Sequence, residues 1–175
     1  MALTRARPIF GSAQARDRIA GIIGDVLRRP RDFATLARDA VKMRGDIAKH
    51  KPPAGPLDVK LIEGGLVDLE FLVHVTQFRC NAGFAPALPD ALRALAEQHA
   101  LPADLAAAHD LLTRYLVVSR LVSPGSTEPA EASRALVARA CGAESWDTLL
   151  ESLAQARQSI AAPWGAIVAD YGETN

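Results

Sequence analysis

The stretch from Leu66 to Cys80 is the strongest constraint on what this chain can fold into. It contains no proline or glycine, and it predicts a helix with apolar residues on most of its faces. A helix of this kind is normally buried on most sides. Other segments of the chain must therefore pack around it.

Two glycines and two carboxylates mark the start of this apolar helix. Gly64 and Gly65 precede it, and Asp68 and Glu70 lie in its first two turns. Paired glycines allow positive φ and the close approach of another group. With Lys60 they can hold a phosphate on backbone N–H groups at the helix start. The neighbouring acids mean that such a site would need magnesium or a second basic group.

A polar stripe along the same helix allows a simpler interpretation. Glu70, His74, Gln77 and Asn81 share one side and can form a solvated face of an amphipathic helix. His74 follows Glu70 by four residues, so the two can pair. Metal sites in helical bundles use two Glu-x-x-His pairs, and this chain has one candidate with a different spacing. We expect an ion pair and no metal site.

Helical periodicity and capping residues predict an all-α protein, an antiparallel helical bundle of about six to seven helices. Hydrophobic residues make up 49% of the chain and aromatic residues 5%, and β-branched residues form no alternating runs that would favour a sheet. Leu57 to Ile62 alternates and predicts a short extended segment, and Pro163 is expected to kink or split the last helix. The predicted helices cover about 12–29, 32–50, 65–81, 90–99, 101–122, 129–142 and 145–171.

Charge, cysteine content and hydrophobic runs give no sign of binding to nucleic acid or membranes, or of a disulfide-stabilised fold. The formal net charge is zero, which gives no general attraction to nucleic acid or to an anionic membrane. Cys80 and Cys141 form no disulfide framework and no CxxC motif. No apolar run is long enough to span a membrane, and the first residues do not resemble a secretory signal. We therefore expect a cytoplasmic protein.

The order of several motifs resembles one enzyme family, the bacterial glutamine synthetase adenylyltransferases. The motifs are Ala2 to Pro8, Met43-Arg44, Asp58-Val-Lys60 and Glu63-Gly-Gly-Leu-Val-Asp-Leu-Glu-Phe71. The resemblance runs from residue 2 to about Arg79. The acid at position 68 is similar to the pattern that follows the C-terminal, adenylylating catalytic domain of that family.

The resemblance implies that the parent enzyme transfers AMP from ATP to a tyrosine of glutamine synthetase, using Mg²⁺. The family's catalytic core is a sheet with a Gly-Ser and an Asp-x-Asp metal pair, and this chain has no such motif. Residues 1–10 then correspond to the tail of a missing nucleotidyltransferase domain, and residues 11–175 to the helical bundle. We expect no catalytic residue, no bound ATP or Mg²⁺ and no activity in this chain alone. The implied partners are glutamine synthetase, the PII signal protein and the protein's own catalytic domain.

The resemblance also assigns candidate site residues, for which two roles stay open. Lys60, Gly64, Gly65, Asp68 and Glu70 either face the nucleotide pocket or form the interface with the catalytic domain. In both cases we expect the glycines and carboxylates to be exposed and unpartnered when that domain is absent. The alternative function is a stand-alone helical module that binds other proteins and has no nucleotide chemistry.

Overall fold

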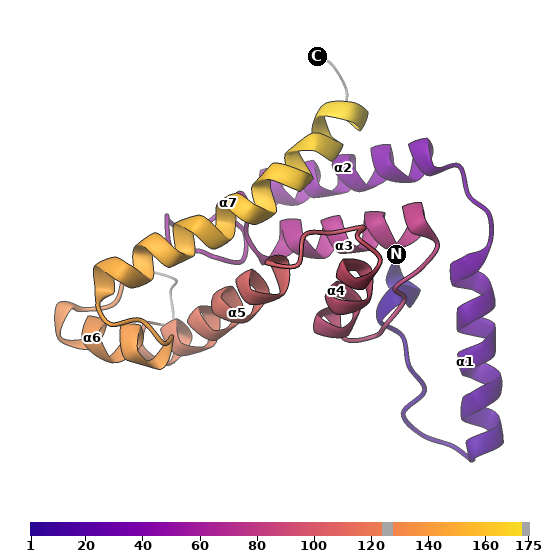
Figure 1. Cartoon of the computed structure of the whole chain (residues 1–175), viewed down its shortest axis with the longest axis horizontal. Coiled ribbons are helices and arrows are strands. Elements are labelled where there is room, and N and C mark those ends of the chain that lie inside the picture. The colour runs from indigo at the N-terminus through magenta and orange to yellow at the C-terminus, as the bar shows by residue number, and fades with distance from the viewer. Residues whose placement is uncertain (124–127, 173–175) are drawn as a thin grey trace.

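A computed structural model describes residues 1–123 and 128–172. Over these residues the chain forms seven α-helices, one short 3₁₀ helix and no strand, which confirms the all-α prediction (Figure 1). The elements in chain order are η1 (Ala2–Arg5), α1 (Ala13–Arg28), α2 (Phe33–His50), α3 (Leu66–Cys80), α4 (Leu88–Glu97), α5 (Leu105–Val122), α6 (Glu131–Ala140) and α7 (Trp146–Tyr171).

Three helix starts are fixed by the capping side chains that the sequence predicts. Ser12, Asp32 and Ser145 each accept a hydrogen bond from the backbone N–H three residues later. Such a bond satisfies one of the N–H groups that the first turn leaves without a partner. At its other end, α3 stops at Asn81, which takes the left-handed conformation with φ of 49°.

The bundle is organised around α7, which runs diagonally across the molecule (Figure 1). It packs against α2 and α3 at one end and against α5 and α6 at the other, and α4 lies against α3 and α5. As expected for a helix that is apolar on most faces, α3 is buried on several sides. Its fully or nearly fully buried apolar residues are Leu69, Phe71, Leu72, Val73 and Val75.

Helix α1 stands to one side of the bundle (Figure 1). Its main packing partner is the short turn η1, and Leu27 is its one buried residue. The bundle proper therefore consists of α2 to α7, with α1 as an appendage. The proposed division between a tail at residues 1–10 and a domain at 11–175 stays a prediction.

One local prediction is wrong, and one of the two alternatives of another is excluded. Leu57 to Ile62 forms successive turns instead of an extended segment, because no strand lies beside it to pair with. Pro163 does not split the last helix, since α7 continues from Trp146 to Tyr171. Ile160, Trp164 and Ile167 are buried on both sides of the proline, so packing holds the helix together there.

The N-terminal residues are more ordered than their composition suggests. Ala2 to Arg5 forms η1, in which the buried Thr4 donates its hydroxyl to the carbonyl of Met1 at 2.6 Å. Among the described residues, no helix combines the length and apolarity needed to cross a membrane.

Candidate functional site

The candidate site lies in the loop that leads into α3, and this loop is closed on itself by hydrogen bonds. The buried carboxylate of Asp58 accepts from the backbone N–H groups of Ala54, Lys60 and Leu61 at 3.1 to 3.3 Å. The carbonyl of Asp58 accepts two further bonds, from Leu61 and Ile62. A local network of this kind replaces the pairing that a strand would have supplied.

The backbone N–H groups at the start of α3 already have partners within the chain. Gly65 donates to Ile62, Leu66 to Val59 and Val67 to Lys60, at 2.8 to 3.1 Å. Gly64 donates to the carboxylate of Asp68 at 2.7 Å. A phosphate at a helix start is held by N–H groups that lack such partners. These four N–H groups therefore support the loop in this structure.

Asp68 is buried and fully engaged, which corrects the expectation that it is exposed and unpartnered. Its side chain is 2% exposed, and one carboxylate oxygen accepts from the Arg44 guanidinium on α2. The other oxygen accepts from Gly64, and Arg44 also donates to the carbonyl of Leu61 at 3.0 Å. A buried carboxylate needs this pairing because an isolated charge in the interior is costly.

The two glycines are also buried, and the group that approaches them belongs to the chain itself. Gly64 has φ of +71°, and a Cβ there would lie 2.2 Å from the carbonyl oxygen of Arg157 on α7. A Cβ on Gly65 would lie 2.6 Å from the carbonyl of Val59. Arg157 in turn donates from Nε to the carbonyl of Glu63 at 3.1 Å. The glycine pair therefore allows the loop to pack against α7.

Glu70 and Lys60 lie on the outside of the structure. Glu70 pairs with Arg5 of η1 at 3.2 Å, and the two side chains are 40% and 64% exposed. Glu70 is therefore accessible, as expected, but it has a partner. Lys60 is exposed. The five candidate residues thus do not converge on one point: three form the interior of the loop, and two lie at the surface.

The polar stripe on α3 is only partly a solvated face. Asn81 is exposed, but Gln77 is fully buried and donates its side-chain amide to the carbonyl of Gly83 at 2.8 Å. His74 bonds to the side-chain oxygen of Gln77 at 3.0 Å, instead of pairing with Glu70. Burial lowers the pKa of His74, although this bond and the charge of Glu70 oppose the shift.

Arg44 and Arg157 are the residues whose role the sequence does not predict. Arg44 has a detectable signature, because it occupies a position of the apolar stripe of α2, four residues after the buried Ala40. An arginine on an apolar stripe needs a buried acid as its partner. Arg157 offers no comparable pattern, since its contact is with the backbone of a segment 94 residues away.

The two carboxylates of the candidate set already have partners within the chain. Both carboxylate oxygens of Asp68 are occupied, and Glu70 pairs with Arg5. In the described part of the chain, no three residues of the types His, Cys, Asp and Glu lie together in a way that could hold a metal ion. The arrangement can position a loop and present a surface.

Comparison with known proteins identifies a set of relatives. No family model matches the chain. The chain is 34% identical over 167 residues to the bifunctional glutamine synthetase adenylyltransferase/adenylyl-removing enzyme of Rhizobium meliloti, a match that covers 90% of this chain and 17% of the relative. The protein of the same name from Caulobacter vibrioides is 32% identical over 179 residues, covering 96% of this chain and 18% of the relative. That from Brucella suis is 48% identical over 89 residues, covering 51% and 9%. The chain thus spans less than a fifth of the length of these relatives.

Proposed function

We propose a function from one premise: this chain is homologous to a segment of the bifunctional glutamine synthetase adenylyltransferase/adenylyl-removing enzymes. The function is that of a helical domain in an enzyme that transfers AMP from ATP to a tyrosine of glutamine synthetase. The observation that carries this proposal is the identity of 32 to 34% across 90 to 96% of the chain.

The domain's task is to support an active site that lies elsewhere in the enzyme. ATP and Mg²⁺ would bind to the catalytic domain, because the backbone N–H groups of Gly64 to Val67 and the carboxylate of Asp68 already have partners within the chain. The buried Asp68, Gly64 and Gly65 hold that loop against α2 and α7. The loop then forms a fixed surface for the catalytic domain to contact.

Glu70 and Lys60 are the candidates for that contact. Glu70 already holds Arg5 of the N-terminal turn, the segment that would connect to the catalytic domain. Lys60 is exposed in the loop that precedes α3. This favours the domain-interface role over the nucleotide-pocket role for both residues. Other surfaces of the bundle would meet glutamine synthetase or the PII signal protein.

An assay of AMP transfer tests the proposed division of labour. The chain is incubated with glutamine synthetase, Mg²⁺ and ATP labelled on the α-phosphate, beside the full-length Caulobacter vibrioides enzyme as positive control. We expect labelled glutamine synthetase with the full-length enzyme and none with this chain. Transfer of label by this chain alone would refute the assignment of catalysis to another domain.

A substitution in an enzyme that carries this segment tests the interface. Glu70→Gln keeps the side-chain volume and removes the charge that attracts Arg5. We expect slower adenylylation with the stability of the isolated helical domain nearly unchanged, since an exposed pair contributes little. Asp90→Asn on α4 removes an exposed carboxylate of similar surroundings and serves as the control. Equal rates for both variants would remove Glu70 from the interface.

A further inference from the structure

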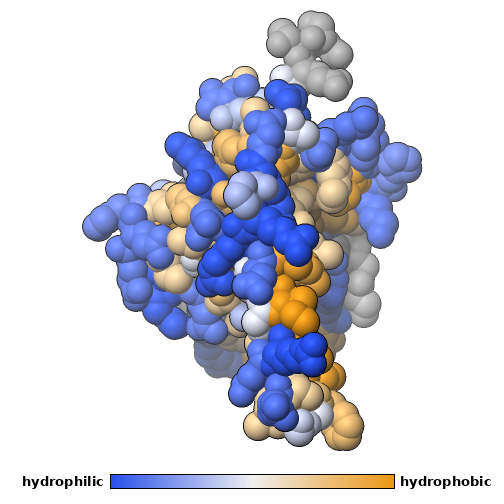
Figure 2. Space-filling model, turned by 90° about the vertical axis from the view of Figure 1, so that its right-hand side faces the viewer, coloured by the Kyte–Doolittle hydropathy of each residue, from blue (hydrophilic) through white to orange (hydrophobic). Residues whose placement is uncertain are grey.

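The outward side of α1 carries an apolar stripe that the described part of the chain leaves open. Ile19 is 46% exposed and Ile22 is 55% exposed. Ala15 is exposed one turn before Ile19, and Val26 is half-buried one turn after Ile22. Figure 2, which looks onto the side of the molecule where α1 stands, shows hydrophobic surface running down this region between charged residues. A different side of α1 faces the N-terminal turn η1.

The spacing of the stripe is that of a helix that pairs with another helix. The four positions are separated by four, three and four residues, which keeps them in one line along the helix. Isoleucines at the two central positions offer branched side chains of the kind that pack between two helices. The stripe is therefore suited to a partner that is itself a helix with an apolar seam.

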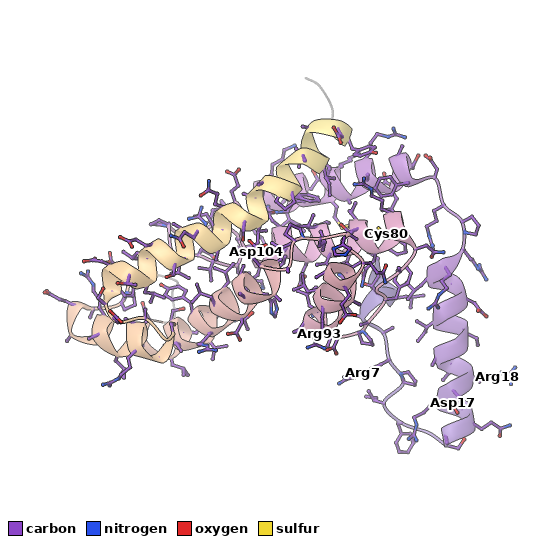
Figure 3. The ribbon with its side chains drawn as sticks, viewed as in Figure 1. Arg7, Asp17, Arg18, Cys80, Arg93 and Asp104 are labelled. Atoms are coloured by element: carbon purple, nitrogen blue, oxygen red, sulfur yellow. The ribbon has the colours of Figure 1, made fainter. Side chains whose placement is uncertain are left out.

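The charges beside the stripe indicate which helix that is. Arg18 and Asp25 lie on the same flank, seven residues apart, and both are exposed. Figure 3 shows Arg18 pointing away from the body of the molecule. In an antiparallel pair of helices the same flank of each helix meets, so Arg18 of one copy would face Asp25 of the second copy, and the reverse pair would form as well.

The apolar residues agree with the same alignment. When Ile19 of one copy lies beside Ile22 of the other, Ala15 lies beside Val26. This same register brings Arg18 of one copy next to Asp25 of the other.

A parallel pair of α1 helices does not bring opposite charges together. It would place the flank with Arg18 against the flank that carries Arg16 and no acid. We propose that this chain forms a dimer through an antiparallel pairing of α1 with α1 of a second copy. This inference does not depend on the proposed function.

The contact between the two α1 helices is small, so the dimer is expected to be weak and must be tested at high protein concentrations. A helix of 16 residues offers less than the roughly 1,200 Å² of a stable interface, so we expect a dissociation constant of roughly 10 to 100 μM. Sedimentation equilibrium of the full chain between about 5 and about 500 μM spans that range. We expect a change from mostly monomer to mostly dimer.

Charge variants test the pairing of Arg18 with Asp25. Asp25→Arg places arginines opposite each other at both ends of the contact, and we expect dimerisation to weaken about tenfold or more. The double variant Arg18→Asp/Asp25→Arg reverses both charges and should restore the wild-type constant to within about threefold. Asp17→Arg makes the same charge change off the paired flank and should leave the constant within about threefold of wild type.

Cysteine trapping tests the orientation. In a chain whose exposed Cys80 is changed to serine, Ala15→Cys and Val26→Cys are made separately and mixed under mild oxidation. The antiparallel alignment predicts that disulfides form rapidly between the two variants and slowly within either one alone. Ile22→Asp, at an exposed position, should abolish the dimer while circular dichroism stays unchanged.

Three results would contradict the antiparallel α1 dimer. A chain that stays monomeric at all concentrations, including one whose stripe binds some other protein, would overturn it. A dimer that is insensitive to Asp25→Arg and Ile22→Asp would place the contact elsewhere. Trapping within each cysteine variant alone would show a parallel arrangement and contradict the antiparallel one.

Discussion

A single buried ion pair ties together the two parts of the chain that meet at the candidate site. Arg44 comes from α2 and Asp68 from α3, and both also bond to the loop between them, at Leu61 and Gly64. The pair therefore fixes the loop as well as the two helices. Its partners could not be chosen from the sequence, because either charge has many possible counterparts until the helices are packed.

The first prediction concerns this pair. Asp68→Asn leaves the Arg44 charge buried without a countercharge, and we expect the free energy of unfolding to fall by about 3 to 5 kcal/mol. Urea denaturation followed by circular dichroism measures it. Asp90→Asn breaks an exposed pair with Arg93 and should cost less than about 1 kcal/mol. Equal losses for the two variants would contradict the burial of Asp68.

The second prediction concerns Gly64. Gly64→Ala combines a positive φ with a Cβ placed 2.2 Å from the Arg157 carbonyl, so we expect a loss of at least about 2 kcal/mol. Gly45→Ala in α2 meets nothing within 4 Å and should stabilise the chain by roughly 0.5 to 1 kcal/mol. Thermal unfolding of both variants decides the matter. A harmless Gly64→Ala would mean that α7 does not lie against the loop.

At the scale of elements, the sequence predicts helices well where a local side chain fixes them. Ser12, Asp32 and Ser145 mark helix starts through bonds within one turn, and the start of α3 follows from its glycine pair. Local patterns are not sufficient where distant packing decides. The alternation at Leu57 to Ile62 needs a neighbouring strand to become extended, and Pro163 is accommodated because the helix around it is held by α2 and α3.

The same contrast between local contacts and distant packing explains which expectations for the candidate site were met. The glycine pair correctly indicates that something approaches the backbone closely, but the sequence does not indicate that this is α7. The acids of α3 suggest an open site, whereas Asp68 turns inward to α2 and Glu70 outward to η1. Positions 68 and 70 lie on different sides of the helix, and on a helix that is apolar on most faces only the packed neighbours decide which of those sides faces the core.

The third prediction concerns α1. This helix buries one residue and packs mainly on a short turn, so its hydrogen bonds should open without unfolding the bundle. Hydrogen exchange measured by mass spectrometry at about 2 μM, where the chain is expected to be monomeric, should show rapid exchange across α1 and slow exchange across α3. Equal protection of α1 and α3 would show that α1 belongs to the cooperative core.

At the scale of the whole molecule, two histidines make stability depend on pH. Burial lowers the pKa of both His74 and His109 from their ordinary value of 6.5. Between the lowered pKa and 6.5, the unfolded chain binds more protons than the folded chain. The free energy of unfolding therefore rises with pH in that window and falls as the pH drops below 6.5.

The fourth prediction follows from this sign. The urea midpoint of the wild-type chain should fall between pH 7 and pH 5, and the double variant His74→Gln/His109→Gln should show a shallower fall because neither position titrates. His99→Gln makes the same change of residue type at an exposed position and is the matched control. The same slope in all three proteins would assign the pH dependence to other groups.

Helix α7 packs against both halves of the bundle, and this determines what a truncation of the gene would do to the fold. A premature stop codon within it would not trim a peripheral piece. It would remove at once the helix that α2 and α3 share with α5 and α6. Tyr171, in its last turn, still packs edge-on against Phe33 at the start of α2, with ring centroids 5.6 Å apart. The last helix in the sequence is thus needed by both halves of the bundle.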